Sequence, residues 1–130
     1  MLFEEILTSI EKNGLDENMK KLLEELYGKK FLKAIKAVNS FSVKKYIFLP
    51  SNRIVWIVIG KKREYFVIPR IYCQCNEFYI NVVIKRKSDL CYHILAQAIA
   101  EKIGKYETYE VSDSDFIRLN AEWKKEEVDK

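Results

Sequence analysis

The feature that most constrains this chain is the position of its soft metal ligands. All three cysteines and the single histidine lie between positions 73 and 93, in the pairs Cys73-Gln-Cys75 and Cys91-Tyr-His93. Three thiolates and one imidazole are a usual ligand set of structural zinc. An odd number of cysteines argues against a disulfide framework. We therefore predict one zinc ion bound by Cys73, Cys75, Cys91 and His93.

Local geometry indicates how these four side chains can meet. Residues two apart in an extended segment point to the same side, so Cys73 and Cys75 can reach one ion. Within a regular helix, residues two apart point in nearly opposite directions, so Cys91 and His93 can converge only at a helix entrance. Each residue alone could be an ordinary buried core residue. Their joint spacing favours the metal site.

Residues 1–39 show the apolar periodicity of helices. Breaks at Asn13-Gly14 and Tyr27-Gly28 divide the region into three helices, and Asp16 is placed to cap the second. The stripes, in chain order, are Leu2, Phe3, Ile6, Leu7 and Ile10, then Met19, Leu22, Leu23 and Leu26, then Phe31, Ala34, Ile35 and Val38. Each helix has one apolar face, so each should pack against another element.

The pattern changes to that of strands after residue 40. Segments 43–49, 53–59 and 63–68 are rich in β-branched and aromatic residues and are separated by short polar turns, which predicts an antiparallel meander. Pro69 ends the third strand because proline cannot donate to a ladder. Residues 72–77 should form a knuckle around the first two ligands. Residues 78–84 are expected to be a further extended stretch.

Two helices are expected in the remainder of the chain. Ser88 or Asp89 should cap a helix that runs to about Ile103 and ends at Gly104. After a linker, residues 112–115 resemble a capping box and open a last amphipathic helix. The chain is thus predicted to be an α+β protein with a helical segment (1–39), a zinc-binding core (40–104) and a C-terminal linker and helix (105–130).

The ligands and their flanks resemble the SWIM zinc-finger family, whose pattern is C-x-C-x(n)-C-x-H. Residues 73–78, CQCNEF, and 90–95, LCYHIL, match the two halves of that pattern, and the strands at 54–60 and 63–68 match its usual approach. The resemblance covers roughly residues 44–103 and is greatest to short archaeal SWIM proteins, which are similar to the SWIM subunit of the Shu recombination-mediator complex. It implies a RadA/RAD51-type recombinase paralogue as partner and a supporting role in homologous recombination and DNA repair.

The same ligand set argues against catalysis. Four protein ligands leave no open position on the ion for a water molecule, so a structural zinc has no obvious hydrolytic capacity. The single histidine is used as a ligand, and the sequence has no glycine-rich phosphate loop. We expect a binding protein and not an enzyme.

Two other sets of residues are candidate binding sites. Basic side chains in two turns could contact single-stranded DNA, or could simply be solvated: Lys61, Lys62, Arg63, Lys85, Arg86 and Lys87. Phe116, Leu119 and Trp123 form one apolar face of the last helix, which could anchor a partner or fold back on the chain's own core. A homodimer through the N-terminal helices is a further alternative.

Net charge and hydropathy limit the remaining classes. The net charge of +4, from 23 basic and 19 acidic residues, is too small to make nucleic-acid binding the default interpretation. The longest apolar run, at residues 54–60, is far shorter than a membrane span. The N-terminal residues are acidic and amphipathic, unlike a signal peptide. We expect a cytoplasmic protein without a membrane partner.

Overall fold

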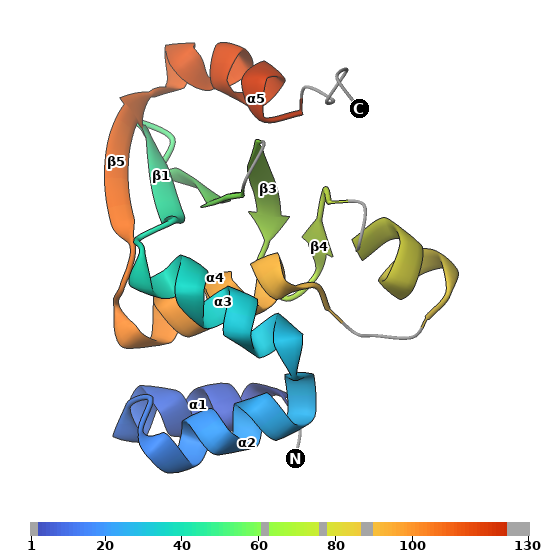
Figure 1. The fold of residues 1–130 in the computed structure, drawn as a ribbon. Coiled ribbons are helices and arrows are strands. Elements are labelled where there is room, and N and C mark those ends of the chain that lie inside the picture. Colours follow the sequence, from blue (N-terminus) through green and yellow to red (C-terminus); the bar gives the residue numbers. More distant parts are fainter. Residues whose placement is uncertain (1–2, 61–62, 76–77, 87–89, 125–130) are drawn as a thin grey trace.

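The computed structural model describes residues 3–60, 63–75, 78–86 and 90–124 (Figure 1). Three helices come first, then four strands, a helical segment, a helix, a strand and a final helix. In chain order they are α1 (Phe3–Asn13), α2 (Glu17–Tyr27), α3 (Lys29–Asn39), β1 (Val43–Leu49), β2 (Arg53–Ile59), β3 (Glu64–Ile68), β4 (Tyr72–Cys73), η1 (Phe78–Ile84), α4 (Tyr92–Ile103), β5 (Glu107–Ser112), η2 (Asp113–Asp115) and α5 (Phe116–Lys124). The α+β prediction is confirmed.

The N-terminal helices begin and end where the sequence indicated. The Asp16 side chain accepts a hydrogen bond of 2.8 Å from the Met19 backbone N–H, which caps α2. Gly28 separates α2 from α3 at φ 57°, a left-handed value that a residue with a Cβ rarely adopts. Within the described part of the chain, none of the helices is long and apolar enough to cross a membrane.

The strands form one mixed sheet in the order β4-β3-β2-β1-β5. The strands β1, β2 and β3 make the predicted antiparallel meander, with Trp56 opposite Lys45 in β1 and Val67 in β3, and the short strand β4 of the knuckle adds to its edge. The fifth strand, β5, lies in the segment that we expected to be a linker. It pairs parallel to β1, with Tyr46 opposite Tyr109, so β4 and β5 extend the sheet by two strands beyond the predicted meander.

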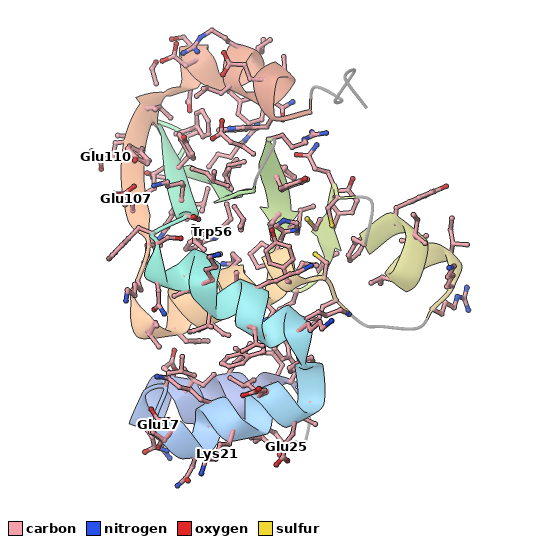
Figure 2. All side chains as sticks on the ribbon, in the orientation of Figure 1. Glu17, Lys21, Glu25, Trp56, Glu107 and Glu110 are labelled. Atoms are coloured by element: carbon pink, nitrogen blue, oxygen red, sulfur yellow. The ribbon has the colours of Figure 1, made fainter. Side chains whose placement is uncertain are left out.

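The sheet lies between helices α1–α4 and the last helix α5 (Figure 1), and it separates two apolar cores, whose side chains are drawn in Figure 2. On one face, Trp56 and Val58 pack against a core shared with α1, α3 and α4. On the other face, Val55 and Ile57 pack against Trp123 of α5. Strand β2 is central and buried on both faces, which explains why its sequence is a continuous apolar run without polar alternation.

The C-terminal helix α5 covers its face of the sheet with the predicted stripe. Trp123 is 2% exposed, and its ring lies 4.9 Å from that of Tyr46 between ring centroids. Phe116 stacks edge-on against Phe48 at 5.1 Å, and Leu119 packs on the same core. The face Phe116, Leu119 and Trp123 therefore folds back on the chain's own sheet. This packing corrects the partner-anchor alternative for Trp123, because that side chain has almost no surface left to offer.

Two expectations around the knuckle were wrong. Residues 78–84 form the π-helical turn η1 and not an extended stretch. A strand would place Ile80 on the same face as Phe78 and Val82, but Ile80 is 41% exposed while the other two side chains reach the main core. The following helix begins at Tyr92 with Cys91 at its N-cap, later than the predicted caps. The two predicted caps, Ser88 and Asp89, lie outside the described residues.

Candidate metal centre

The first two ligand residues lie at the end of a short edge strand. Cys73 is the last residue of β4 and pairs with Val67 of β3. The next residue extends this pairing, because the Gln74 side-chain oxygen accepts a hydrogen bond of 2.6 Å from the Phe66 N–H. This extended backbone places Cys73 and Cys75 on the same side, as the spacing predicted.

The second two ligand residues lie at a helix entrance. Cys91 has extended backbone angles, φ −98° and ψ 174°, and its carbonyl accepts a hydrogen bond from the Leu95 N–H at the first turn of α4. His93 is therefore in the first turn, where its side chain can converge with that of Cys91. Lys30 of α3 donates a 2.9 Å hydrogen bond to the Leu90 carbonyl and so supports this entrance from outside.

The ligand atoms of Cys73, Cys75, Cys91 and His93 lie within 4.8 Å of one another, and all four side chains are buried. Tetrahedral zinc with Zn–S bonds of about 2.3 Å separates its ligand atoms by about 3.6–3.8 Å, so the cluster needs a contraction of at most about 1 Å to hold the ion. Cys91 Sγ and His93 Nδ1 are already 3.8 Å apart. This distance favours Nδ1 as the ligand atom of the imidazole. The residues fit zinc, and the chain binds it here.

The surroundings hold two of the ligand side chains in place. The Phe78 backbone N–H donates a 3.3 Å hydrogen bond to Cys75 Sγ, a contact that stabilises a thiolate. The His93 ring lies between the rings of Tyr65 and Tyr92, with centroid distances of 4.2 and 4.0 Å. Its Nε2 is buried and has no hydrogen-bond partner among the described residues, which leaves ring packing as the restraint on the imidazole plane.

The sulfur atoms of the centre lie close enough to shift one another's protonation. Hydrogen bonds with Cys75 and Cys91 raise the pKa of the Cys73 thiol, and hydrogen bonds with Cys73 and Cys91 lower the pKa of the Cys75 thiol. One sulfur thus favours the thiolate while its neighbour stays protonated. Zinc replaces these shared protons, because it binds thiolates and releases protons on binding.

The sequence predicted the four ligand residues, but it did not indicate the groups that position them. Lys30, Gln74 and Tyr65 come from α3, the knuckle and β3, and nothing in their local sequence signals a role near Cys91 or His93. Tyr92 is the exception, because it stands between two ligands at the first residue of a helix. It was overlooked because an aromatic residue there is equally typical of a core.

The structure separates the predicted basic residues. Arg63 donates a 2.9 Å hydrogen bond from Nη2 to the Trp123 carbonyl, so its guanidinium fastens α5 to the sheet. Lys85 and Arg86 follow η1 and are exposed. Lys61, Lys62 and Lys87 lie outside the described residues.

The mixed sheet, the knuckle at its edge and the helix entrance define a structural zinc-finger domain with a closed Cys3His ligand set. Comparison with known proteins gives the family. Over 106 residues the chain is 27% identical to the zinc finger SWIM domain-containing protein 7 homolog of Dictyostelium discoideum, which covers 80% of this chain and 68% of that protein. It is 31% identical to zinc finger SWIM domain-containing protein 7 of Mus musculus, over 77% of this chain and 66% of that protein.

An archaeal protein is similar over a larger share of its own length. An uncharacterized protein of Archaeoglobus fulgidus is 31% identical, over 82% of this chain and 88% of that protein. No protein-family model and no solved structure matches the chain. The relatives and the ligand cluster together show that the chain belongs to the SWIM zinc-finger family.

Proposed function

We propose that this chain is an adaptor that binds a RadA/RAD51-type recombinase paralogue and supports homologous recombination and DNA repair. The observation that carries the proposal is the SWIM ligand cluster in a chain similar to proteins named zinc finger SWIM domain-containing protein 7. The sequence resemblance to the SWIM subunit of a recombination-mediator complex supplies the class of partner. A cytoplasmic location is part of the same proposal.

The metal centre supports a binding role over a catalytic one. All four ligand side chains are at most 5% exposed, so the ion is enclosed by protein on every ligand side. A zinc ion with four protein ligands supplies binding energy that is also folding energy, and it offers no position to a substrate. The four ligand residues would thus join the edge of the sheet to the N-terminal end of α4 through the metal.

Binding to the recombinase paralogue encoded in the same genome tests the proposal. The purified zinc-loaded chain and the paralogue, mixed at about 10 μM each, should form a stable complex by size-exclusion chromatography with light scattering. The catalytically competent recombinase of that genome is the control for specificity. If neither protein shifts the elution of the chain at this concentration, the adaptor proposal is wrong.

A second candidate function is direct binding of single-stranded DNA. Lys85 and Arg86 are exposed at the end of η1, where they could neutralise phosphates. Fluorescence anisotropy with a labelled oligonucleotide at several salt concentrations distinguishes the two functions. Submicromolar affinity with a steep salt dependence, lost in a Lys85→Glu and Arg86→Glu double variant, would favour DNA. A weak response with little salt dependence would leave the adaptor as the better account.

A further inference from the structure

The segment η1 exposes an unusual amount of apolar surface. Tyr79 is 60% exposed, Ile84 58%, Val83 51% and Ile80 41%. We call these four residues the η1 patch. Single exposed apolar side chains need no explanation, but a contiguous set of them marks an interaction site in most soluble proteins.

The opposite side of η1 is already used by the chain itself. Phe78 is 5% exposed and packs edge-on against Tyr72, with ring centroids 5.5 Å apart, and Val82 packs on the main core. The described side chains of η1 are thus apolar both toward and away from the core. A helix that is apolar all round is ordinarily buried all round. The η1 patch is therefore apolar surface of a kind that is ordinarily buried, and within the described chain nothing buries it.

The metal centre holds η1 in place. The Phe78 N–H donates to Cys75 Sγ, and the Tyr79 N–H donates a 3.2 Å hydrogen bond to the Cys75 carbonyl. The π-type pattern is closed by a 2.8 Å hydrogen bond from the Lys85 N–H to the Ile80 carbonyl. Figure 1 shows η1 as the olive helical turns that stand out beyond β4, away from the helical layers. Such π-helical turns occur frequently at functional sites.

The charge beside the patch indicates the chemistry of what covers it. Lys85 and Arg86 are exposed directly after Ile84, and among the described residues no acidic side chain forms an ion pair with either. A second copy of this chain would bring its own Lys85 and Arg86 against these two, and like charges in close contact are unfavourable. A partner surface that combines apolar side chains with carboxylates is complementary to the apolar η1 patch and to the positive charges of Lys85 and Arg86.

We propose that the η1 patch, with Lys85 and Arg86 at its rim, is the docking surface for an acidic amphipathic helix of a protein partner. This inference deepens the adaptor function proposed above and rests on it for the identity of that partner. Apolar side chains of the partner helix cover Tyr79 and Ile84, and its carboxylates face Lys85 and Arg86. Recognition of an amphipathic helix depends on a few apolar anchors at helical spacing.

The test uses a patch variant and a matched control. Tyr79→Glu combined with Ile84→Glu places charges at the two most exposed positions of the patch, and Ile117→Glu does the same at an 82% exposed position on α5. Circular dichroism and zinc content should match the wild type for both, since none of these side chains is in the core. We expect the patch variant to bind the recombinase paralogue at least 10-fold more weakly, and Ile117→Glu to bind it normally.

A second probe makes the result independent of the paralogue. It is a labelled synthetic helical peptide with leucine and tryptophan on one face and glutamate on the other, compared with a twin that carries lysine in place of glutamate. The acidic peptide should bind the wild type at least 10-fold more tightly than its twin, and should lose this preference in the patch variant.

The outcomes separate the two proposals. If the paralogue binds the wild type and the patch variant equally, the docking inference is wrong while the adaptor function stands. If the paralogue does not bind at all, the adaptor function is wrong. The comparison of the two peptides then decides whether the η1 patch binds an acidic helix. Three outcomes would each overturn the proposed partner class. The first is equal binding of the acidic peptide and its lysine twin. The others are concentration-dependent self-association that is lost in the patch variant, and patch-dependent co-sedimentation with phosphatidylglycerol vesicles.

Discussion

Replacement of Cys91 by serine should remove both the zinc and much of the stability of the domain. Cys91 is fully buried, is one of four ligands, and is the N-cap of α4, whose carbonyl starts the helix. Structural zinc contributes about 10–16 kcal/mol at neutral pH in small domains, or about 2.5–4 kcal/mol for each of four ligands. A hydroxyl is a far poorer zinc ligand than a thiolate, so the variant should lose at least this share, and release of the ion adds the shares of the other three ligands.

The expected loss of unfolding free energy is a large fraction of the total stability of the domain. Domains of this size are stable by about 5–15 kcal/mol, so a loss of at least about 2.5–4 kcal/mol lowers the melting temperature by roughly 10 °C or more. Thermal unfolding followed by circular dichroism, with and without a chelator, measures it. The wild type should melt at a lower temperature with chelator, while Cys91→Ser should give the same low value in both conditions.

A core substitution in the same helix separates metal loss from simple destabilisation. Ile99 is fully buried in α4, and Ile99→Ala should cost about 2–5 kcal/mol. This variant should still hold one zinc per chain and should still be destabilised by chelator. If Cys91→Ser retains stoichiometric zinc and the wild-type melting temperature, or if chelator leaves the wild type unchanged, the assigned role of the metal centre is refuted.

Three further predictions follow from the same structure. Trp123→Ala should destabilise by about 3–5 kcal/mol in urea unfolding, because a 2% exposed indole that packs on Tyr46 and its neighbours in the sheet is replaced by a cavity; a loss under 1 kcal/mol would contradict the packing of α5. Acidification should release zinc, since protons compete with the metal for thiolates, and a metal-sensitive dye should report the release before the helical signal is lost. The hydrogen bond from Lys44 lowers the pKa of Glu107 below its usual 4.5. The contact therefore stabilises the fold above pH 4.5, and this stabilisation is lost as the pH falls through the lower folded-state pKa. An NMR titration that gave an ordinary pKa for Glu107 would show that the contact is absent in solution.

Local sequence patterns predicted most of the helices and strands because each carries its own signal. Gly14 and Gly28 adopt positive φ values where the helical periodicity breaks. After Arg53, the rest of β2 is apolar, mostly β-branched and free of charge, which is typical of a strand buried on both faces. The four metal ligands were predictable for a related reason, since their spacing is itself a local property.

The errors lie where a non-local contact determines the structure. Strand β5 pairs parallel to β1, which is remote in sequence, and its residues are mostly exposed, so no apolar alternation marks it. At residues 78–84, the β-branched composition favoured an extended stretch, but a helical turn lets Phe78 and Val82 reach the core while Ile80 between them stays exposed. The start of α4 was predicted too early, because Cys91 takes the capping position that Ser or Asp usually occupies.

The metal centre fastens both ends of the segment 76–90, since Cys75 precedes it and Cys91 follows it. An insertion there adds to a loop whose ends are already joined, so its entropic cost rises only slowly with length. The sheet, α4 and the terminal helices rely on this segment at Phe78, Val82 and Leu90, which pack in the main core, and not at its exposed positions. Those exposed positions can therefore change in residue type or number while the four ligands and the core residues keep the same scaffold.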